Sequence, residues 1–331
     1  MNVGIVKLSS IGDVVHALPV AVALKRHDAA IRVTWIVEAR EAALVEHHPD
    51  VDEVVVADTR GWRRTRPRWR AVRAAHALGR ALRRRAFDVV LDVQGLVKSG
   101  LVTAATRAPR RIGFAAPYVR ERASAMFTTE RVQPPGDRHV VEQYLAVLGP
   151  LGITAPVVRF DLAVSPDADA RIERWLTAAG IKPRDALVVL NAGAGRDDKR
   201  WPAARHAALA RGLAADAGAR VVTVWGPGEE DDARAIADAA PGALAAPPTS
   251  LHELAALVRR ARLVVAGDTG PLHMAAALGT PCLGLYGPTS AARNGPYGAI
   301  HRTLTGADRR MASIAADTAL ATAISMLEAE G

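Results

Sequence analysis

Short apolar runs alternate with amphipathic stretches along most of this 331-residue chain. Each run is rich in Val, Ile and Leu and ends in glycine or polar residues, which is typical of strands buried in a parallel sheet. Such runs lie at 3–6, 33–37, 54–57, 89–91, 186–190, 221–225, 263–266 and 282–286. Helices are expected between them, for example at 68–86, 203–217 and 271–278. This alternation predicts an α/β protein built on doubly wound parallel sheets.

An irregular stretch interrupts the pattern near the middle of the chain. Residues 149–166 contain three prolines and show neither helical nor strand periodicity. We therefore expect two Rossmann-like lobes, at 1–160 and 161–331, without an internal repeat of fixed period. In open sheets of this kind ligands bind beyond the carboxyl ends of the strands, so motifs at those ends are the candidates for function.

The charge of the chain is strongly basic, with a formal net charge of +9 and a pI near 10.3. Such a protein favours an anionic partner: nucleic acid, a phospholipid surface or an acidic substrate, unless the excess of arginine is compositional drift. The single cysteine, Cys282, excludes an internal disulfide and indicates a reducing cytoplasm. The alanine-rich tail at 314–327 is too short for a membrane span, and the N-terminus does not resemble a targeting segment.

The first motif at a strand end is Lys7-Leu-Ser-Ser-Ile-Gly-Asp13. A strand delivers two hydroxyls and a glycine, and a helix then opens with Asp13 in its first turn. Carboxylates stabilise helix N-termini, so Asp13 serves either as a helix cap or as a general base at the mouth of a ligand site. Ser9 and Ser10 likewise serve either the turn or a ligand.

Two motifs in the second half could hold phosphate. The glycine loop 191–195 leads into Lys199, and free backbone N–H groups with a lysine charge suit a phosphate. No third glycine follows at dinucleotide-fold spacing, which argues against an NAD site, and Trp201 is interpreted as a core residue. In Gly267-Asp-Thr-Gly-Pro-Leu-His273, Thr269 takes the N-cap position of a helix. Asp268 could bond sugar hydroxyls, and His273 is either structural or part of that site.

A basic stretch runs from Arg60 to Arg85 and contains 11 arginines and no acidic residue. It is either a solvated helix face or a platform for phosphate and carboxylate groups, which arginine binds bidentately. Lys98 and, less directly, Arg120 are expected to join it. Two Asp-x-Asp sequences, at 50–52 and 167–169, have the spacing of a cation site but do not follow strand ends, so we expect no required metal.

Together these motifs resemble the ADP-heptose:lipopolysaccharide heptosyltransferases of glycosyltransferase family 9. The resemblance rests on five segments in the same order, and the second of them is most like heptosyltransferase I. The segments are 7–19, 92–99, 197–202, 225–226 with 267–273, and 286–289.

The resemblance implies a GT-B fold, with two Rossmann-like lobes and a last helix, here 308–330, that crosses back to the first lobe. It implies an inverting enzyme without metal or cofactor, which moves heptose from ADP-heptose to the 3-deoxy-octulosonic acid of lipid A. It also implies a cytoplasmic protein attached peripherally to the anionic inner membrane, with no nucleic acid partner. Asp13 would be the catalytic base. The implied donor-binding residues are Ser10, Gly12, Lys199, Glu229, Asp268, Thr269, Gly270 and His273. The implied acceptor-binding residues are Arg60, Arg63, Arg64, Lys98 and Arg120.

Three alternatives remain at this stage. A nucleic-acid-binding protein would explain the pI but not the motifs at strand ends. A nucleotide-sugar epimerase on the same scaffold would act on the donor without an acceptor. A close relative could add a different sugar or use a later core heptose as acceptor, because fold and motifs do not fix the substrate.

Overall fold

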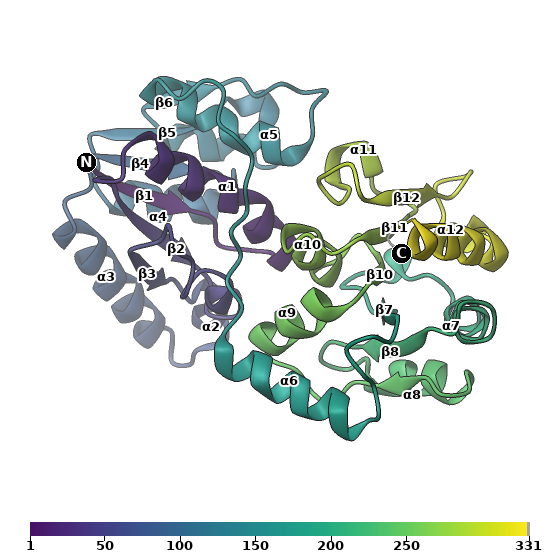
Figure 1. Cartoon of the computed structure of the whole chain (residues 1–331). Helices are drawn as coiled ribbons and strands as arrows, with labels where there is room; N and C mark the ends of the chain where they lie inside the picture. Colours follow the sequence, from purple (N-terminus) through teal and green to yellow (C-terminus); the bar gives the residue numbers. More distant parts are fainter. Residues whose placement is uncertain (330–331) are drawn as a thin grey trace. The chain divides into compact units, whose positions relative to one another are not determined.

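The computed structural model describes residues 1–329, apart from the side chain of Arg63. The chain divides into two compact units, Met1–Ala163 and Val164–Gly331 (Figure 1). Each unit is built around one six-stranded sheet, in which all neighbouring strands are parallel. The α/β class and the pair of parallel sheets expected from the sequence are confirmed.

The first sheet has the strand order β3-β2-β1-β4-β5-β6. Its strands are β1 (Asn2–Val6), β2 (Arg32–Val37), β3 (Glu53–Val56), β4 (Val89–Asp92), β5 (Arg110–Phe114) and β6 (Glu130–Val132). The helices of this unit are α1 (Ile11–His27), α2 (Thr59–Arg64), α3 (Arg68–Arg84), α4 (Val97–Ala105) and α5 (Val140–Leu145), with 3-10 turns at Ala42–Leu44, Ala116–Tyr118, Arg122–Phe127 and Ala146–Leu151.

The second sheet has the order β12-β11-β10-β7-β8-β9, which repeats the order of the first when its strands are counted from β7. Its strands are β7 (Leu187–Asn191), β8 (Arg220–Val224), β9 (Leu244–Ala245), β10 (Leu263–Gly267), β11 (Cys282–Tyr286) and β12 (Arg302–Thr305). The helices are α6 (Pro166–Ala178), α7 (Ala203–Ala217), α8 (Glu230–Asp238), α9 (Leu251–Arg260), α10 (Gly270–Ala277), α11 (Ala291–Asn294) and α12 (Ala316–Glu328), with 3-10 turns at Asp197–Lys199 and Met311–Ser313.

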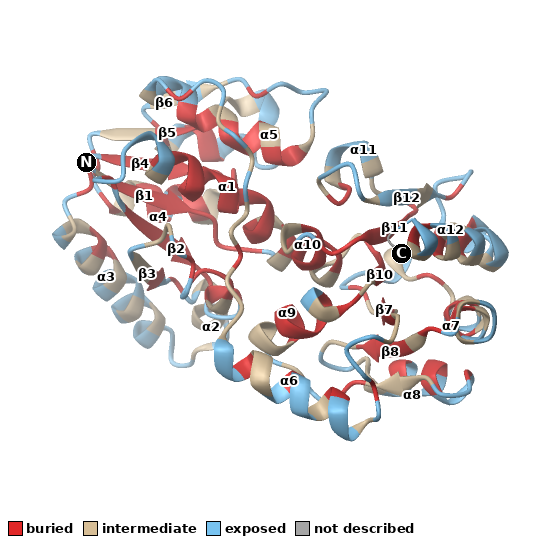
Figure 2. Cartoon of the chain, viewed as in Figure 1, coloured by how far each residue is buried: buried red, intermediate tan, exposed pale blue. Residues whose placement is uncertain are grey.

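Burial follows from side chains alternating across the two faces of each sheet. In the first unit, Val6 and Leu8 pack with Leu82 of α3 in one core cluster, so the residue between them, Lys7, faces the opposite side. The central strands are buried along their length, whereas α3 shows exposed residues along one side (Figure 2). Within residues 1–329, no helix combines the length and the hydropathy that crossing a bilayer requires.

The end of the chain differs from the expectation of one helix over 308–330. Asp308 instead accepts a hydrogen bond from Ser313 and pairs with Arg310 in a loop, and α12 begins only at Ala316. The family resemblance implied that this helix crosses back to the first lobe. Its buried residues Ala319, Ala323 and Met326 lie in the core of the second unit, where α12 packs against α7. Residue 330 lies outside the described residues.

Candidate active site

In each sheet, the chain leaves two neighbouring central strands toward opposite edges of the sheet. β1 lies beside β4 in the first sheet, and β7 lies beside β10 in the second. Connections leave toward opposite edges at such a pair, and ligands in open α/β sheets bind in the crevice beyond its carboxyl ends. The motifs that contain Asp13, Lys98, Lys199 and Asp268 follow these four strands, so these candidate residues lie at one such switch point in each unit.

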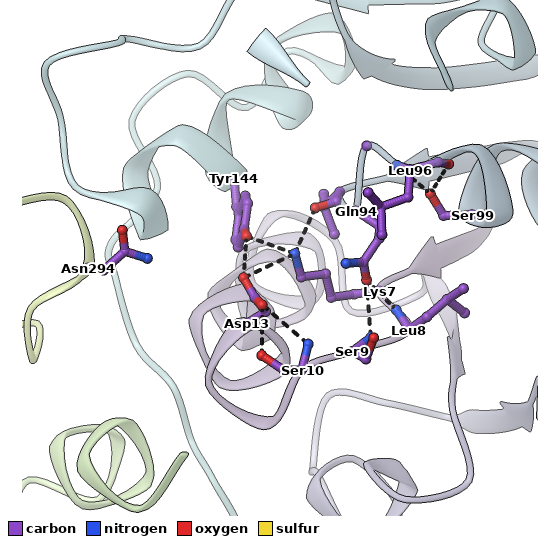
Figure 3. A network of polar contacts seen from close by, with 12 residues as sticks. Lys7, Leu8, Ser9, Ser10, Asp13, Gln94, Leu96, Ser99, Tyr144 and Asn294 are labelled. Carbon is purple, nitrogen blue, oxygen red and sulfur yellow. Dashed lines mark hydrogen bonds and ion pairs between the residues drawn. The ribbon is translucent and has the colours of Figure 1, made fainter. Parts of the chain in front are cut away.

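At the first switch point, Asp13 occupies the first turn of α1 and is held from two sides (Figure 3). Its Oδ2 accepts hydrogen bonds from the backbone N–H of Ser10 at 3.2 Å and from the Ser10 hydroxyl at 2.9 Å. Its Oδ1 accepts a hydrogen bond from the Tyr144 hydroxyl at 3.0 Å and lies 3.7 Å from Nζ of Lys7. The helix-cap interpretation of Asp13 therefore applies, and its carboxylate still keeps 37% of its side-chain area exposed.

The protonation state of Asp13 follows from these neighbours. Burial by itself would raise the pKa of the carboxyl group, but the Lys7 charge and the hydrogen bonds from Ser10 and Tyr144 lower the pKa to about 2. The carboxylate is thus ionised throughout the neutral range, as a group that accepts a proton must be.

The Asp92-Val-Gln-Gly motif after β4 shapes the loop beside Asp13. Asp92 is buried and accepts hydrogen bonds from the N–H groups of Gln94 and Gly95, at 3.0 and 3.2 Å. The side-chain oxygen of Gln94 then accepts the N–H groups of Leu8 and Ser9, at 2.9 and 3.1 Å. Burial raises the pKa of Asp92, although the hydrogen bonds oppose it. The motif therefore ties the two switch-point strands together through backbone groups.

Two of the predicted acceptor-binding cations are paired with buried carboxylates. Nζ of Lys98 lies 3.3 Å from Oε1 of Glu38 and 3.4 Å from the hydroxyl of Ser9. Arg60 pairs with Glu41 at 3.3 Å. Both glutamates follow β2 and are 1% exposed, whereas the side chains of Lys98 and Arg60 keep 27% and 39% of their area exposed. The exposed parts of Lys98 and Arg60 can therefore bind an anion, while Glu38 and Glu41 remain buried.

The remaining acceptor candidates are less closely tied to this site. Arg64 ends α2 and is exposed, and Arg120 is exposed in the loop between β5 and β6. The side chain of Arg63 lies outside the described residues. On α3 the exposed residues include Trp69 and Val72 beside several arginines, while Leu82 on the other side packs on the sheet.

At the second switch point, Asp268 joins two of the predicted donor-binding residues. Its Oδ2 lies 2.7 Å from Nζ of Lys199, and its Oδ1 lies 3.0 Å from Nε2 of His273. Burial alone would raise the pKa of Asp268, but the hydrogen bonds and charges of His273 and Lys199 lower it well below its usual range. His273 is 4% exposed, so it supports Asp268 from inside the fold, whereas the side chain of Lys199 is 20% exposed.

The start of α10 is linked to the loop after β7. Thr269 is the N-cap residue and Gly270 the first residue of this helix. The side-chain amide of Asn191 donates to the Thr269 hydroxyl at 3.1 Å and to the carbonyl of Gly193 at 2.9 Å. Asn191 thus joins β7 to the α10 N-terminus, where backbone N–H groups favour an anion.

Glu229, the N-cap residue of α8, lies close to the loops that contain Gly193 and Gly226, which follow β7 and β8. Its carboxylate accepts the N–H of Gly226 at 2.9 Å and pairs with Arg200 at 3.4 Å. A Cβ atom on Gly193 would overlap this carboxylate, so the loop after β7 approaches Glu229 closely because Gly193 lacks a side chain. The predicted nucleoside-binding residue is therefore adjacent to the predicted phosphate-binding loop.

Trp201, Asp52 and Asp169, which the sequence analysis interpreted as structural, make contacts within the fold. Trp201 is buried in the core and donates to the carbonyl of Ile314 at 3.0 Å. Asp52 pairs with Lys25. Asp169, in the first turn of α6, pairs with Arg259 and Arg260.

Sequence reasoning did not single out Tyr144, Glu38 or Glu41. The glutamates could have been found, because they follow the predicted strand 33–37 as the other motifs follow theirs. Tyr144 could not, because it lies on α5, away from any strand end, and meets Asp13 across 131 residues of sequence. Lys7 and Gln94 lie within two of the sequence motifs, 7–13 and 92–99, but the sequence predicts no role for either.

Comparison with known proteins shows the family of this chain. The family model described as glycosyltransferase family 9 (heptosyltransferase) matches residues 75–321. Lipopolysaccharide heptosyltransferase 1 of Escherichia coli is 32% identical over 303 residues, which cover 90% of this chain and 91% of that protein.

Solved structures give the same result. The E. coli heptosyltransferase WaaC with ADP is 30% identical, with a TM-score of 0.84, and covers 98% of this chain and 100% of its own. The structure of WaaC with ADP-2-deoxy-2-fluoro heptose is 29% identical, with a TM-score of 0.81 and complete coverage of both chains. The pair of sheets is thus the GT-B arrangement of these enzymes, and the chain belongs to glycosyltransferase family 9, the heptosyltransferases.

Proposed function

We propose that this chain transfers a heptose from ADP-heptose to the inner-core 3-deoxy-octulosonic acid of lipopolysaccharide, with inversion at the anomeric carbon and without a metal. The observation that carries the proposal is the ionised, partly exposed Asp13 carboxylate at the β1/β4 switch point. The names of its relatives support the choice of reaction, and the WaaC structures with ADP and a fluorinated ADP-heptose support the choice of donor.

The donor is assigned to the second unit. The α10 N-terminus at Thr269 and Gly270 and the ammonium of Lys199 would face the diphosphate. Asp268 would accept sugar hydroxyls, and Glu229 would meet the nucleoside. Ser10 and Gly12, at the start of α1 in the first unit, are assigned to donor binding on the family resemblance.

The reaction is a single displacement. The acceptor oxygen forms a bond to the anomeric carbon as its proton passes to Asp13. The bond from that carbon to the phosphate oxygen breaks, and its electron pair leaves with ADP. The charge that grows on the diphosphate is stabilised by Lys199 and the α10 dipole, which is the task a metal performs in other transferases.

The acceptor carries carboxylate and phosphate groups, which suit arginine and lysine. Arg60 and Lys98 are assigned to it on their geometry, and Arg63, Arg64 and Arg120 on the family resemblance. The arginines of α3, with the exposed Trp69, would attach the enzyme peripherally to the anionic cytoplasmic face of the inner membrane.

The test is release of ADP from ADP-heptose by the purified protein in EDTA, with and without de-acylated inner-core acceptor. We expect release that needs the acceptor and is undiminished by EDTA. Asp13→Asn should lower turnover by about 10²–10⁴-fold and leave ADP binding intact. Asp28→Asn, at the other end of α1, is the matched control.

Other outcomes identify the alternatives. Near-normal turnover by Asp13→Asn would refute the general-base assignment. Conversion of the donor without acceptor would indicate an epimerase or hydrolase. Tight, salt-sensitive binding to duplex DNA with no activity on any nucleotide sugar would favour the nucleic-acid interpretation.

A further inference from the structure

We propose that Lys7 and Tyr144 are positioning residues for Asp13, which orient its carboxylate and leave one lone pair of Oδ1 open to the acceptor hydroxyl. The inference rests on the proposed role of Asp13 as the base. It assigns a function to two residues outside the donor and acceptor sites described above, and it selects which carboxylate oxygen takes the proton.

The choice of oxygen follows from the hydrogen bonds to Asp13. Each carboxylate oxygen offers about two lone-pair sites. Both sites of Oδ2 are used by Ser10, through its N–H and its hydroxyl. Oδ1 accepts one hydrogen bond, from Tyr144, and the 3.7 Å separation from Lys7 is an ion pair rather than a second hydrogen bond. Oδ1 is therefore the oxygen with capacity for the acceptor proton.

Lys7 determines which way the Tyr144 hydroxyl points (Figure 3). Nζ of Lys7 lies 2.7 Å from the Tyr144 oxygen and 3.1 Å from the carbonyl of Val93. A lysine ammonium can only donate, so the Tyr144 oxygen accepts from it and the Tyr144 O–H is directed to Asp13. The ammonium also lies 4.2 Å from the centre of the Tyr144 ring, which fixes the ring against it.

The burial of Lys7 strengthens its interaction with the Asp13 carboxylate. Lys7 is 1% exposed, and a buried ammonium requires anionic compensation. The carboxylates of Asp13 and Asp92 both interact with it. Protonation of Asp13 would remove one of them, so the charge of Lys7 resists protonation before the acceptor arrives. Low basicity then delays proton transfer until the attacking oxygen has begun to bond to the sugar and has become more acidic.

Other titratable groups lie on the helices that flank this network. His16 of α1 and His139, the N-cap residue of α5, meet edge to face, with ring centres 5.5 Å apart. The charge that lowers the pKa of Asp13 is that of Lys7, with hydrogen bonds from Ser10 and Tyr144. A substitution of Lys7 or Tyr144 should therefore change the pKa of Asp13 directly.

The experiment follows the side-chain carboxyl carbon of Asp13 by NMR in the full chain labelled with ¹³C-aspartate, as a function of pH. Asp13→Asn assigns the resonance. Tyr144→Phe keeps the ring and removes only the hydroxyl, and we expect it to raise the pKa of Asp13 by up to about one unit. Lys7→Met should also raise the pKa. Tyr118→Phe, at an exposed tyrosine of the same unit, is the matched control and should leave it unchanged.

The acid limb of kcat/KM should move to higher pH by the same amount in Tyr144→Phe, which a purely structural role would not produce. A Tyr144→Phe variant in which Asp13 titrates as in the wild type, or stays ionised until acid unfolding, overturns the inference even if Lys7→Met fails to fold. The NMR arm needs no substrate. Absence of heptose transfer by the wild type would therefore refute the proposed function alone, and an unmoved titration would refute the positioning roles alone.

Discussion

Replacing Gly193 with alanine tests how closely the loop after β7 packs against the start of α8. The new methyl group would overlap the carboxylate of Glu229 and would have to displace it. That carboxylate accepts the N–H of Gly226 and pairs with Arg200, so displacement breaks a charge-assisted hydrogen bond. The backbone of Gly193 is not left-handed, so alanine meets no other strain there.

The expected cost follows from these contacts. A hydrogen bond to a charged group contributes about 1.5–3 kcal/mol. The change from glycine to alanine returns about 0.4–1 kcal/mol by restricting the unfolded chain. The net loss of unfolding free energy for Gly193→Ala is therefore about 0.5–2.5 kcal/mol, or about 1–10 °C in Tm for a unit of this size.

A double-mutant cycle measures the contact itself. Unfolding by heat and by urea is compared for the wild type, Gly193→Ala, Glu229→Ala and the double variant. Once Glu229 is removed, Gly193→Ala should be neutral or slightly stabilising. Gly195→Ala is the matched control, since a Cβ atom there meets nothing within 4 Å. Equal costs of Gly193→Ala in both backgrounds, or no cost in the wild type, would show that the two loops do not pack as described.

Two further predictions concern charged groups. The pKa of Asp13 is about 2 in the folded chain against 3.8 as its ordinary value, so the ionised carboxylate stabilises the fold above pH 3.8 and this contribution is lost as pH falls toward 2. Asp13→Asn should therefore lower the free energy of unfolding by about 1–2 kcal/mol at pH 7, a range already discounted for the exposure of the carboxylate. Urea unfolding should show a smaller loss at pH 3, and an equal loss at both pH values would contradict this. Lys199→Met should weaken ADP binding by about 10–100-fold in calorimetry, whereas the exposed Lys182→Met should not, and an unchanged Kd for Lys199→Met would remove Lys199 from the diphosphate site.

The sequence predicts β1, β2, β4, β7, β8, β10 and β11 because each is an apolar run buried along most of its length, and it also predicts the edge strand β3. It misses the edge strands β6, β9 and β12 because these are short and carry partly exposed side chains, so hydrophobicity does not mark them. It also misses the inner strand β5, which opens with Arg110 and Arg111 and so does not show an apolar run. The start of α12 is also misjudged. The loop that contains Asp308 is held by the hydrogen bond from Ser313 and the ion pair with Arg310, which periodicity does not reveal.

The candidate site is predictable to the extent that it lies at strand ends. Asp13, Lys98, Asp268 and Thr269 were identified because a polar or glycine-rich turn follows a buried run. The partners that determine their charge state were not. Tyr144 reaches Asp13 only through the packing of α5 on α1, and the burial of Lys7 depends on which face of the sheet it takes.

The shared strand order of the two sheets bears on how such an enzyme can diversify. Most of the candidate residues lie at or beyond the carboxyl ends of inner strands, which are β1, β2 and β4 in the first sheet and β7, β8 and β10 in the second. On the proposed assignment, a change of nucleotide or sugar can arise mainly by remodelling the loops after β7, β8 and β10, while Asp13, Arg60 and Lys98 would keep the base and the acceptor contacts. Donor and acceptor preference can thus evolve, or be engineered, as separate traits of one polypeptide.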